Sequence, residues 1–66
     1  MKVLVNNKER EINQESSIKD LATEMQLPEK GIAIAVNNKM VTRTEWANHL
    51  LNEGDTIVII KAACGG

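Results

Sequence analysis

The sequence predicts a small α+β domain with a mixed sheet of about five strands and one main helix on one face. Short apolar runs of strand length stand near both ends of the chain, and one segment of helical period lies between them. The chain has 66 residues, 42% of them apolar, with one Trp and no Phe or Tyr, so the core must be aliphatic. A single cysteine excludes an internal disulfide, and packing must therefore stabilise one small domain.

The N-terminal segment predicts a hairpin. Residues 2–5 form an apolar first strand, and Asn6, Asn7 and Lys8 form a turn signal. Residues 9–13 alternate weakly, as an edge strand does.

The next segment predicts an amphipathic helix over about 17–26. Ser16 or Ser17 can cap it, and Asp20, three residues after Ser17, resembles a capping box. The apolar positions recur with helical spacing at Ile18, Leu21, Ala22 and Met25.

Two further strands follow the helix. Pro28 and Gly31 end the helical pattern, and residues 32–36 are an unbroken apolar run, typical of a strand that a helix covers. Asn37 and Asn38 tolerate the positive φ of a tight turn, which predicts a fourth strand over 39–42.

The remainder predicts a short helical turn and a final strand. Thr44 is expected to cap a turn over 45–48, with Trp46 and Leu50 tucked beneath the sheet. A turn at 53–55 then precedes an apolar strand over 56–61.

This order of elements fits a β-grasp fold, in which the N- and C-terminal strands pair in parallel at the centre of the sheet. Residues 1–61 are expected to form that domain, and 62–66 a flexible C-terminal tail ending in diglycine.

The first and last strands predict an apolar open face. Because side chains alternate across a strand, four are expected to face the helix, namely Val3, Val5, Ile57 and Ile59. The opposite face then carries Leu4, Val58 and Ile60. Single exposed aliphatic side chains are common, but three on adjacent strands form a contiguous patch, which predicts binding of partner proteins.

Charge and hydropathy exclude several classes of function. Eight Lys and Arg are interspersed with nine Asp and Glu for a net charge of −1, which disfavours nucleic-acid binding. No apolar stretch is long enough to span a membrane, and the first apolar run is too short for a signal peptide. We therefore expect a cytoplasmic protein.

Catalytic and metal-binding patterns are missing from the sequence. His49 has no evident nucleophile or carboxylate partner, and Gly54 and Asp55 form a turn rather than a phosphate loop. We expect no bound cofactor or metal, and a carrier or substrate rather than an enzyme. Cys64 is either a passive small residue, which we favour, or a residue with a redox or persulfide-linked role.

Gly65 and Gly66 are the most informative residues. A terminal glycine lacks Cβ, so its carboxylate can thread a narrow active site and its carbonyl is open to attack once it has a good leaving group. The five residues from Ala62 can reach on the order of 15 Å when extended. The alternative is a tail that simply frays.

The whole chain resembles the ThiS-type sulfur carrier proteins of thiamine biosynthesis, which are ubiquitin-like. The matching features are residues 3–6, residues 35–37, Val41, Arg43, Trp46, Gly54–Asp55 and the final diglycine. The chain departs from the pattern at Thr42, where many members carry Pro, and at Cys64, which the family does not require.

The resemblance implies a cycle centred on Gly66. A ThiF-like adenylyltransferase of the ubiquitin-activating type would use ATP and Mg to adenylate its carboxylate, and sulfur delivered through a persulfide would displace AMP. The thiocarboxylate would then donate sulfur to a ThiG-like thiazole synthase, with Gly65 keeping the tail slender and Leu4, Val58 and Ile60 docking the carrier. The alternatives are the small subunit of molybdopterin synthase, a ubiquitin-like protein modifier, and an interaction domain with an inert tail.

Overall fold

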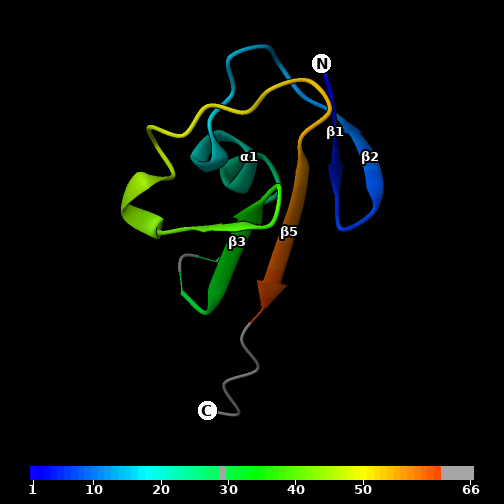
Figure 1. The fold of residues 1–66 in the computed structure, drawn as a ribbon. Helices are drawn as coiled ribbons and strands as arrows, with labels where there is room; N and C mark the ends of the chain where they lie inside the picture. Colours follow the sequence, from blue (N-terminus) through cyan, green and yellow to red (C-terminus); the bar gives the residue numbers. More distant parts are fainter. Residues whose placement is uncertain (29, 62–66) are drawn as a thin grey trace.

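The computed structural model describes residues 1–28 and 30–61 and has the predicted order of elements. It contains one α-helix, one 3₁₀ helix and a mixed five-stranded sheet (Figure 1). The elements are β1 (Lys2–Val5), β2 (Lys8–Glu11), α1 (Ile18–Glu24), β3 (Ile32–Val36), β4 (Lys39–Val41), η1 (Arg43–Glu45) and β5 (Thr56–Lys61).

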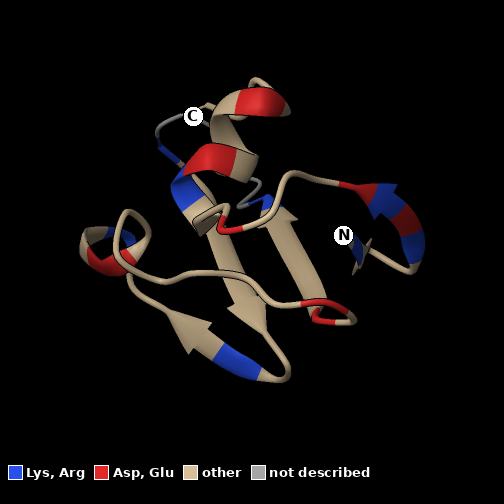
Figure 2. Cartoon of the chain, turned by 90° about the horizontal axis from the view of Figure 1, so that it is seen from above, with Lys and Arg blue, Asp and Glu red and all other residues tan. Residues whose placement is uncertain are grey.

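The sheet has the strand order β2-β1-β5-β3-β4, which places β5 at its centre. β1 and β5 pair in parallel, with Leu4 opposite Thr56 and Val5 opposite Ile57, and the other pairs are antiparallel. α1 lies on one side of the sheet in both views (Figures 1 and 2). The β-grasp prediction is therefore confirmed, including the central parallel pair.

Both hairpins turn at the same tetrapeptide, Val-Asn-Asn-Lys, at residues 5–8 and 36–39. All four asparagines have positive φ, between 51° and 71°. Asparagine tolerates this left-handed region better than most residues, so each pair forms a tight two-residue connection. These turns fix the register of β1 with β2 and of β3 with β4.

The helix is shorter than predicted but begins as predicted. Ser17 is its N-cap: the Ser17 Oγ accepts a hydrogen bond from the Asp20 N–H at 3.1 Å, and the Ser17 N–H donates to Asp20 Oδ2 at 3.0 Å. This is the predicted capping box. α1 ends at Glu24 because Gln26 has a positive φ of 57°, which stops the helix before Pro28.

We expect Ser17→Ala to lower the free energy of unfolding by about 1 kcal/mol, because the Asp20 N–H loses its acceptor. Chemical denaturation measures this, and Ser16→Ala is the control, since Ser16 Oγ donates to the Asn13 carbonyl and caps no helix N–H. A Ser17→Ala variant as stable as the parent would contradict the assignment.

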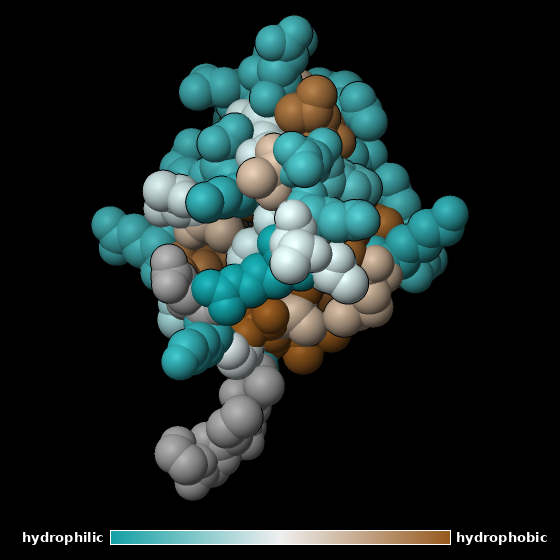
Figure 3. Space-filling view, turned by 90° about the vertical axis from the view of Figure 1, so that its left-hand side faces the viewer, coloured by the Kyte–Doolittle hydropathy of each residue, from teal (hydrophilic) through white to brown (hydrophobic). Residues whose placement is uncertain are grey.

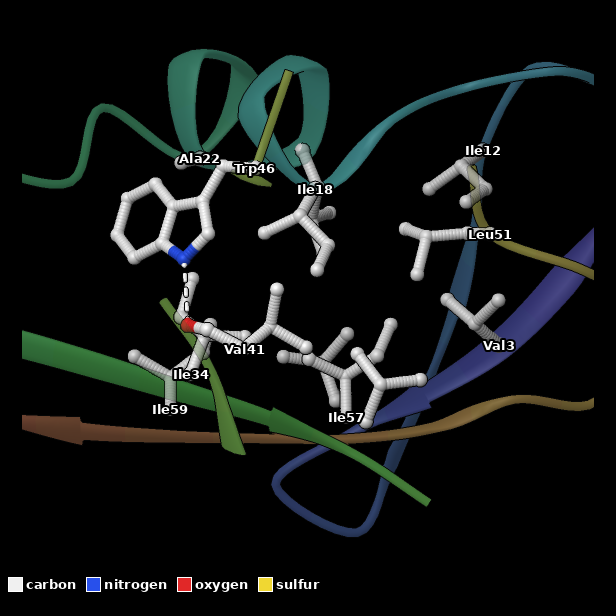
Figure 4. Close-up of a cluster of buried hydrophobic side chains, with 13 residues drawn as sticks. Val3, Ile12, Ile18, Ala22, Ile34, Val41, Trp46, Leu51, Ile57 and Ile59 are labelled. Carbon is white, nitrogen blue, oxygen red and sulfur yellow. Dashed lines mark hydrogen bonds between the residues drawn. The ribbon is translucent and has the colours of Figure 1, made fainter. Parts of the chain in front are cut away.

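The core lies between α1 and the sheet (Figure 4). Its most buried large side chains are Val3, Ile18, Leu21, Ile34 and Ile57, whereas the side of the molecule seen in Figure 3 is mostly hydrophilic. Trp46 is buried as predicted, and its Nε1–H donates to the Val41 carbonyl at 3.1 Å. This bond satisfies the indole N–H, so a single Trp can close the aliphatic core.

Two predictions near the 3₁₀ helix η1 were wrong. η1 covers Arg43–Glu45 rather than 45–48, and Thr44 lies inside it while Thr42 is the N-cap. Leu50 is 54% exposed and Leu51 is buried in its place. This segment is extended beside the start of α1, where the Leu51 N–H donates to the Ser16 carbonyl at 2.8 Å, and neighbouring side chains of an extended chain point in opposite directions.

Candidate functional site

The alternation predicted for β1 and β5 is confirmed. The four side chains expected to face the helix, Val3, Val5, Ile57 and Ile59, are all buried. On the opposite face Val58 is 37% and Ile60 49% exposed, and Leu4 is half-buried. The open face of the sheet therefore presents the predicted apolar side chains.

Met40 also belongs to this face, although it was not predicted. In the register of the sheet Met40 lies opposite Ala35, and Ala35 lies opposite Val58, which makes one continuous row across β4, β3 and β5. Met40 is 62% exposed. A two-residue turn at Asn37–Asn38 implies this pairing, so the signal was present in the sequence. We call Leu4, Met40, Val58 and Ile60 the open-face patch.

The outer strand β2 gives the patch a charged border. Glu9 lies opposite Leu4 and Glu11 opposite Lys2, so these side chains share the open face. The N-terminal ammonium lies 2.9 Å from Glu11 Oε2, and this hydrogen bond, together with the positive charge, lowers the pKa of Glu11. Arg10 points to the other side, where it pairs with Glu24 of α1 at 3.2 Å. An apolar centre beside a charged border is the usual anatomy of a protein interface.

The described part of the chain offers little chemistry of its own. Within residues 1–28 and 30–61, no group of three His, Cys, Asp or Glu is placed to hold a metal ion. His49 is half-buried, and its backbone carbonyl accepts from the Ile18 N–H at 3.0 Å, which is a structural role. Nor does any helix in these ranges have the length and hydropathy to span a membrane.

The described residues form a groove of about 470 Å³ between α1 and η1. Its walls mix basic, polar and apolar side chains, among them Lys19, Gln26, Leu27, Arg43 and Trp46. The groove lining contains neither a carboxylate nor a nucleophile paired with a base, so it does not resemble a catalytic centre.

The open-face patch leads to the C-terminal end of β5. Val58 and Ile60 lie on the last strand, and Lys61, at its end, is paired with Ile32 of β3. The predicted tail, with Cys64, Gly65 and Gly66, lies outside the described residues. Two of the four patch side chains thus lie on the strand at which the described residues end.

Comparison with known proteins gives consistent results. The model of the ThiS family matches residues 3–66. The sulfur carrier protein ThiS of Escherichia coli K12 is 27% identical over 66 residues, covering all of both chains. A crystal structure of a ThiS thiamine biosynthesis protein from Geobacter metallireducens superposes over the whole of both chains with a TM-score of 0.86 at 16% identity. A solution structure of a thiamine biosynthesis protein from the same organism gives 0.81 at 16% identity, covering all of this chain and 88% of that one.

Proposed function

The chain belongs to the ThiS family, and we propose that it is the sulfur carrier protein of a thiamine biosynthesis pathway. The observation that carries this proposal is the family match over residues 3–66, supported by full-length similarity to a curated sulfur carrier. The protein is accordingly a carrier and not an enzyme. The family match also favours this role over a molybdopterin synthase subunit or a protein modifier.

The proposed working group is the carboxylate of Gly66. An adenylyltransferase of the ubiquitin-activating type would use ATP and Mg to convert it into an acyl adenylate. The outer sulfur of a persulfide would then displace AMP to form an acyl disulfide. A thiol would reduce the S–S bond, becoming part of a disulfide itself and releasing the thiocarboxylate, which thiazole synthase would consume. Two final glycines suit this cycle because backbone without side chains fits narrow enzyme channels. The proposed setting is the cytoplasm.

The open-face patch is the proposed docking surface for these enzymes. Its side chains lie on three strands, β1, β4 and β5, and β5 carries two of them shortly before its end. An enzyme that covers Val58 and Ile60 is therefore close to the point where the tail begins. The charged side chains of β2 would form part of the interface rim.

Intact-mass spectrometry tests the proposal directly. We expect the purified chain, incubated with its adenylyltransferase, ATP, Mg, a persulfide donor and a thiol reductant, to gain the mass difference between sulfur and oxygen at Gly66. Adding thiazole synthase and its substrates should restore the original mass, and omitting ATP is the control. Attachment of the chain to lysines of other proteins would instead identify a modifier, and an unchanged mass would refute the proposal.

A further inference from the structure

The two Val-Asn-Asn-Lys turns contact β5 on opposite edges. Asn6 closes the first turn on the β1 edge of β5, where its backbone N–H donates to the Ile57 carbonyl at 2.9 Å. Asn37 closes the second turn beside the start of β5, where its backbone N–H donates to the Thr56 carbonyl at 2.8 Å. Identical local sequences thus support different parts of the same central strand.

The Asn6 side chain continues the β1–β5 ladder beyond the end of β1. Its Oδ1 accepts from the Ile59 N–H at 2.8 Å, and its Nδ2 donates to the Ile59 carbonyl at 3.4 Å. A carboxamide carries the same donor and acceptor as a peptide group. Because the backbone turns away at Asn6 and Asn7, this side chain replaces the next residue that β1 would have supplied.

This contact matters because Ile59 lies close to the end of β5. The β3 edge of β5 is paired as far as Lys61, through Ile32. On the β1 edge, main-chain pairing ends earlier, at Val5 and Ile57. Beyond that point, the Asn6 side chain is the hydrogen-bond partner of the Ile59 peptide groups. The end of β5 is therefore held on both edges only while Asn6 is in place.

We propose that Asn6 is a positioning residue for the C-terminus. By fixing Ile59 in the sheet, it keeps the last described residues of β5 extended, so that Lys61 is held beside the open-face patch. This inference rests on the proposed function of Gly66. Without Asn6, the adenylyltransferase would have to order the end of β5 during docking, at a cost in affinity.

Asn37 provides a matched control. Its side chain also makes two hydrogen bonds, accepting from the Thr56 N–H at 3.0 Å and donating to Asp55 Oδ1 at 3.0 Å. Its φ of 52° is nearly the same as the 51° of Asn6. Glycine adopts positive φ without strain, so Asn6→Gly and Asn37→Gly retain the turns and each remove only side-chain bonds.

The first measurement is amide hydrogen exchange on the carrier alone. We expect Asn6→Gly to speed exchange of the Ile59 amide by about tenfold, because one hydrogen bond is lost, and Asn37→Gly to speed exchange at Thr56 and leave Ile59 unchanged. The conservative variant Asn6→Asp keeps the acceptor for the Ile59 N–H and should retain part of the protection. Unchanged exchange at Ile59 in Asn6→Gly would overturn the proposal.

The second measurement is adenylation kinetics. We expect Asn6→Gly to raise the KM of the adenylyltransferase for the carrier by about fivefold with kcat unchanged, because the enzyme must then order the end of β5 when it binds. We expect Asn37→Gly to have the same KM and kcat as the parent. Equal KM values for the two variants would show that Asn6 only stabilises the fold. If the parent itself is not adenylated, the proposed function fails as well, and the exchange data alone decide whether Asn6 orders the end of β5.

Discussion

Deleting Gly66 is expected to abolish sulfur loading and to leave the domain folded. The shortened chain still ends in a glycine carboxylate, but one that lies about 3.3 Å short of the position reached by the full-length tail. Displacement of a reacting group by as little as 1 Å can lower a rate by roughly a hundredfold. We therefore expect AMP release and the gain of sulfur mass to fall by at least about a hundredfold.

The fold should not change, because the core cluster is built from residues between Val3 and Ile59, well before the deleted glycine. Thermal unfolding should give a free energy within roughly 0.5 kcal/mol of the parent. The matched control is Cys64→Ser, which keeps the tail length and replaces a side chain that we consider passive. Normal loading by the truncated chain would refute the role of Gly66, and loss of loading in Cys64→Ser would give Cys64 a role in sulfur transfer.

Strict alternation explains why the open face could be predicted. In β5 each apolar side chain has a definite side, so Ile57 and Ile59 had to be buried if Val58 and Ile60 were exposed, as the structure shows. β4 is only three residues long and gives no such periodic signal, which is why Met40 was missed. Its position follows only once the pairing through the Asn37–Asn38 turn is considered.

Other features depend on contacts between distant segments. The Asn6 side chain meets Ile59, which is 53 positions away, so nothing local in the sequence distinguishes it from Asn37. The burial of Leu51 instead of the predicted Leu50 has the same origin. Hydrogen bonds to the start of α1 decide which of these two adjacent leucines points inward. Local patterns predicted the elements, whereas these orientations arise from their packing.

Val58→Asp and Ile60→Asp are expected to weaken binding of the adenylyltransferase by roughly a hundredfold, because docking would bury a carboxylate without a partner. Both positions are substantially exposed, at 37% and 49%, so the isolated domain keeps the new charge in water. The loss of folding stability should be limited to about 1 kcal/mol from the lower β-propensity of Asp. Isothermal titration calorimetry and thermal unfolding measure the two effects separately.

The chain supplies a control that matches this substitution in chemistry and exposure. Leu50 is 54% exposed but lies outside the sheet, beside the start of α1, so Leu50→Asp adds the same charge away from the patch. We expect its affinity to equal that of the parent, and Met40→Asp to weaken binding if the interface extends as far as β4. Equal losses for Leu50→Asp and Val58→Asp would indicate a nonspecific effect of negative charge, and parent-like binding by both Val58→Asp and Ile60→Asp would place the docking surface on another face.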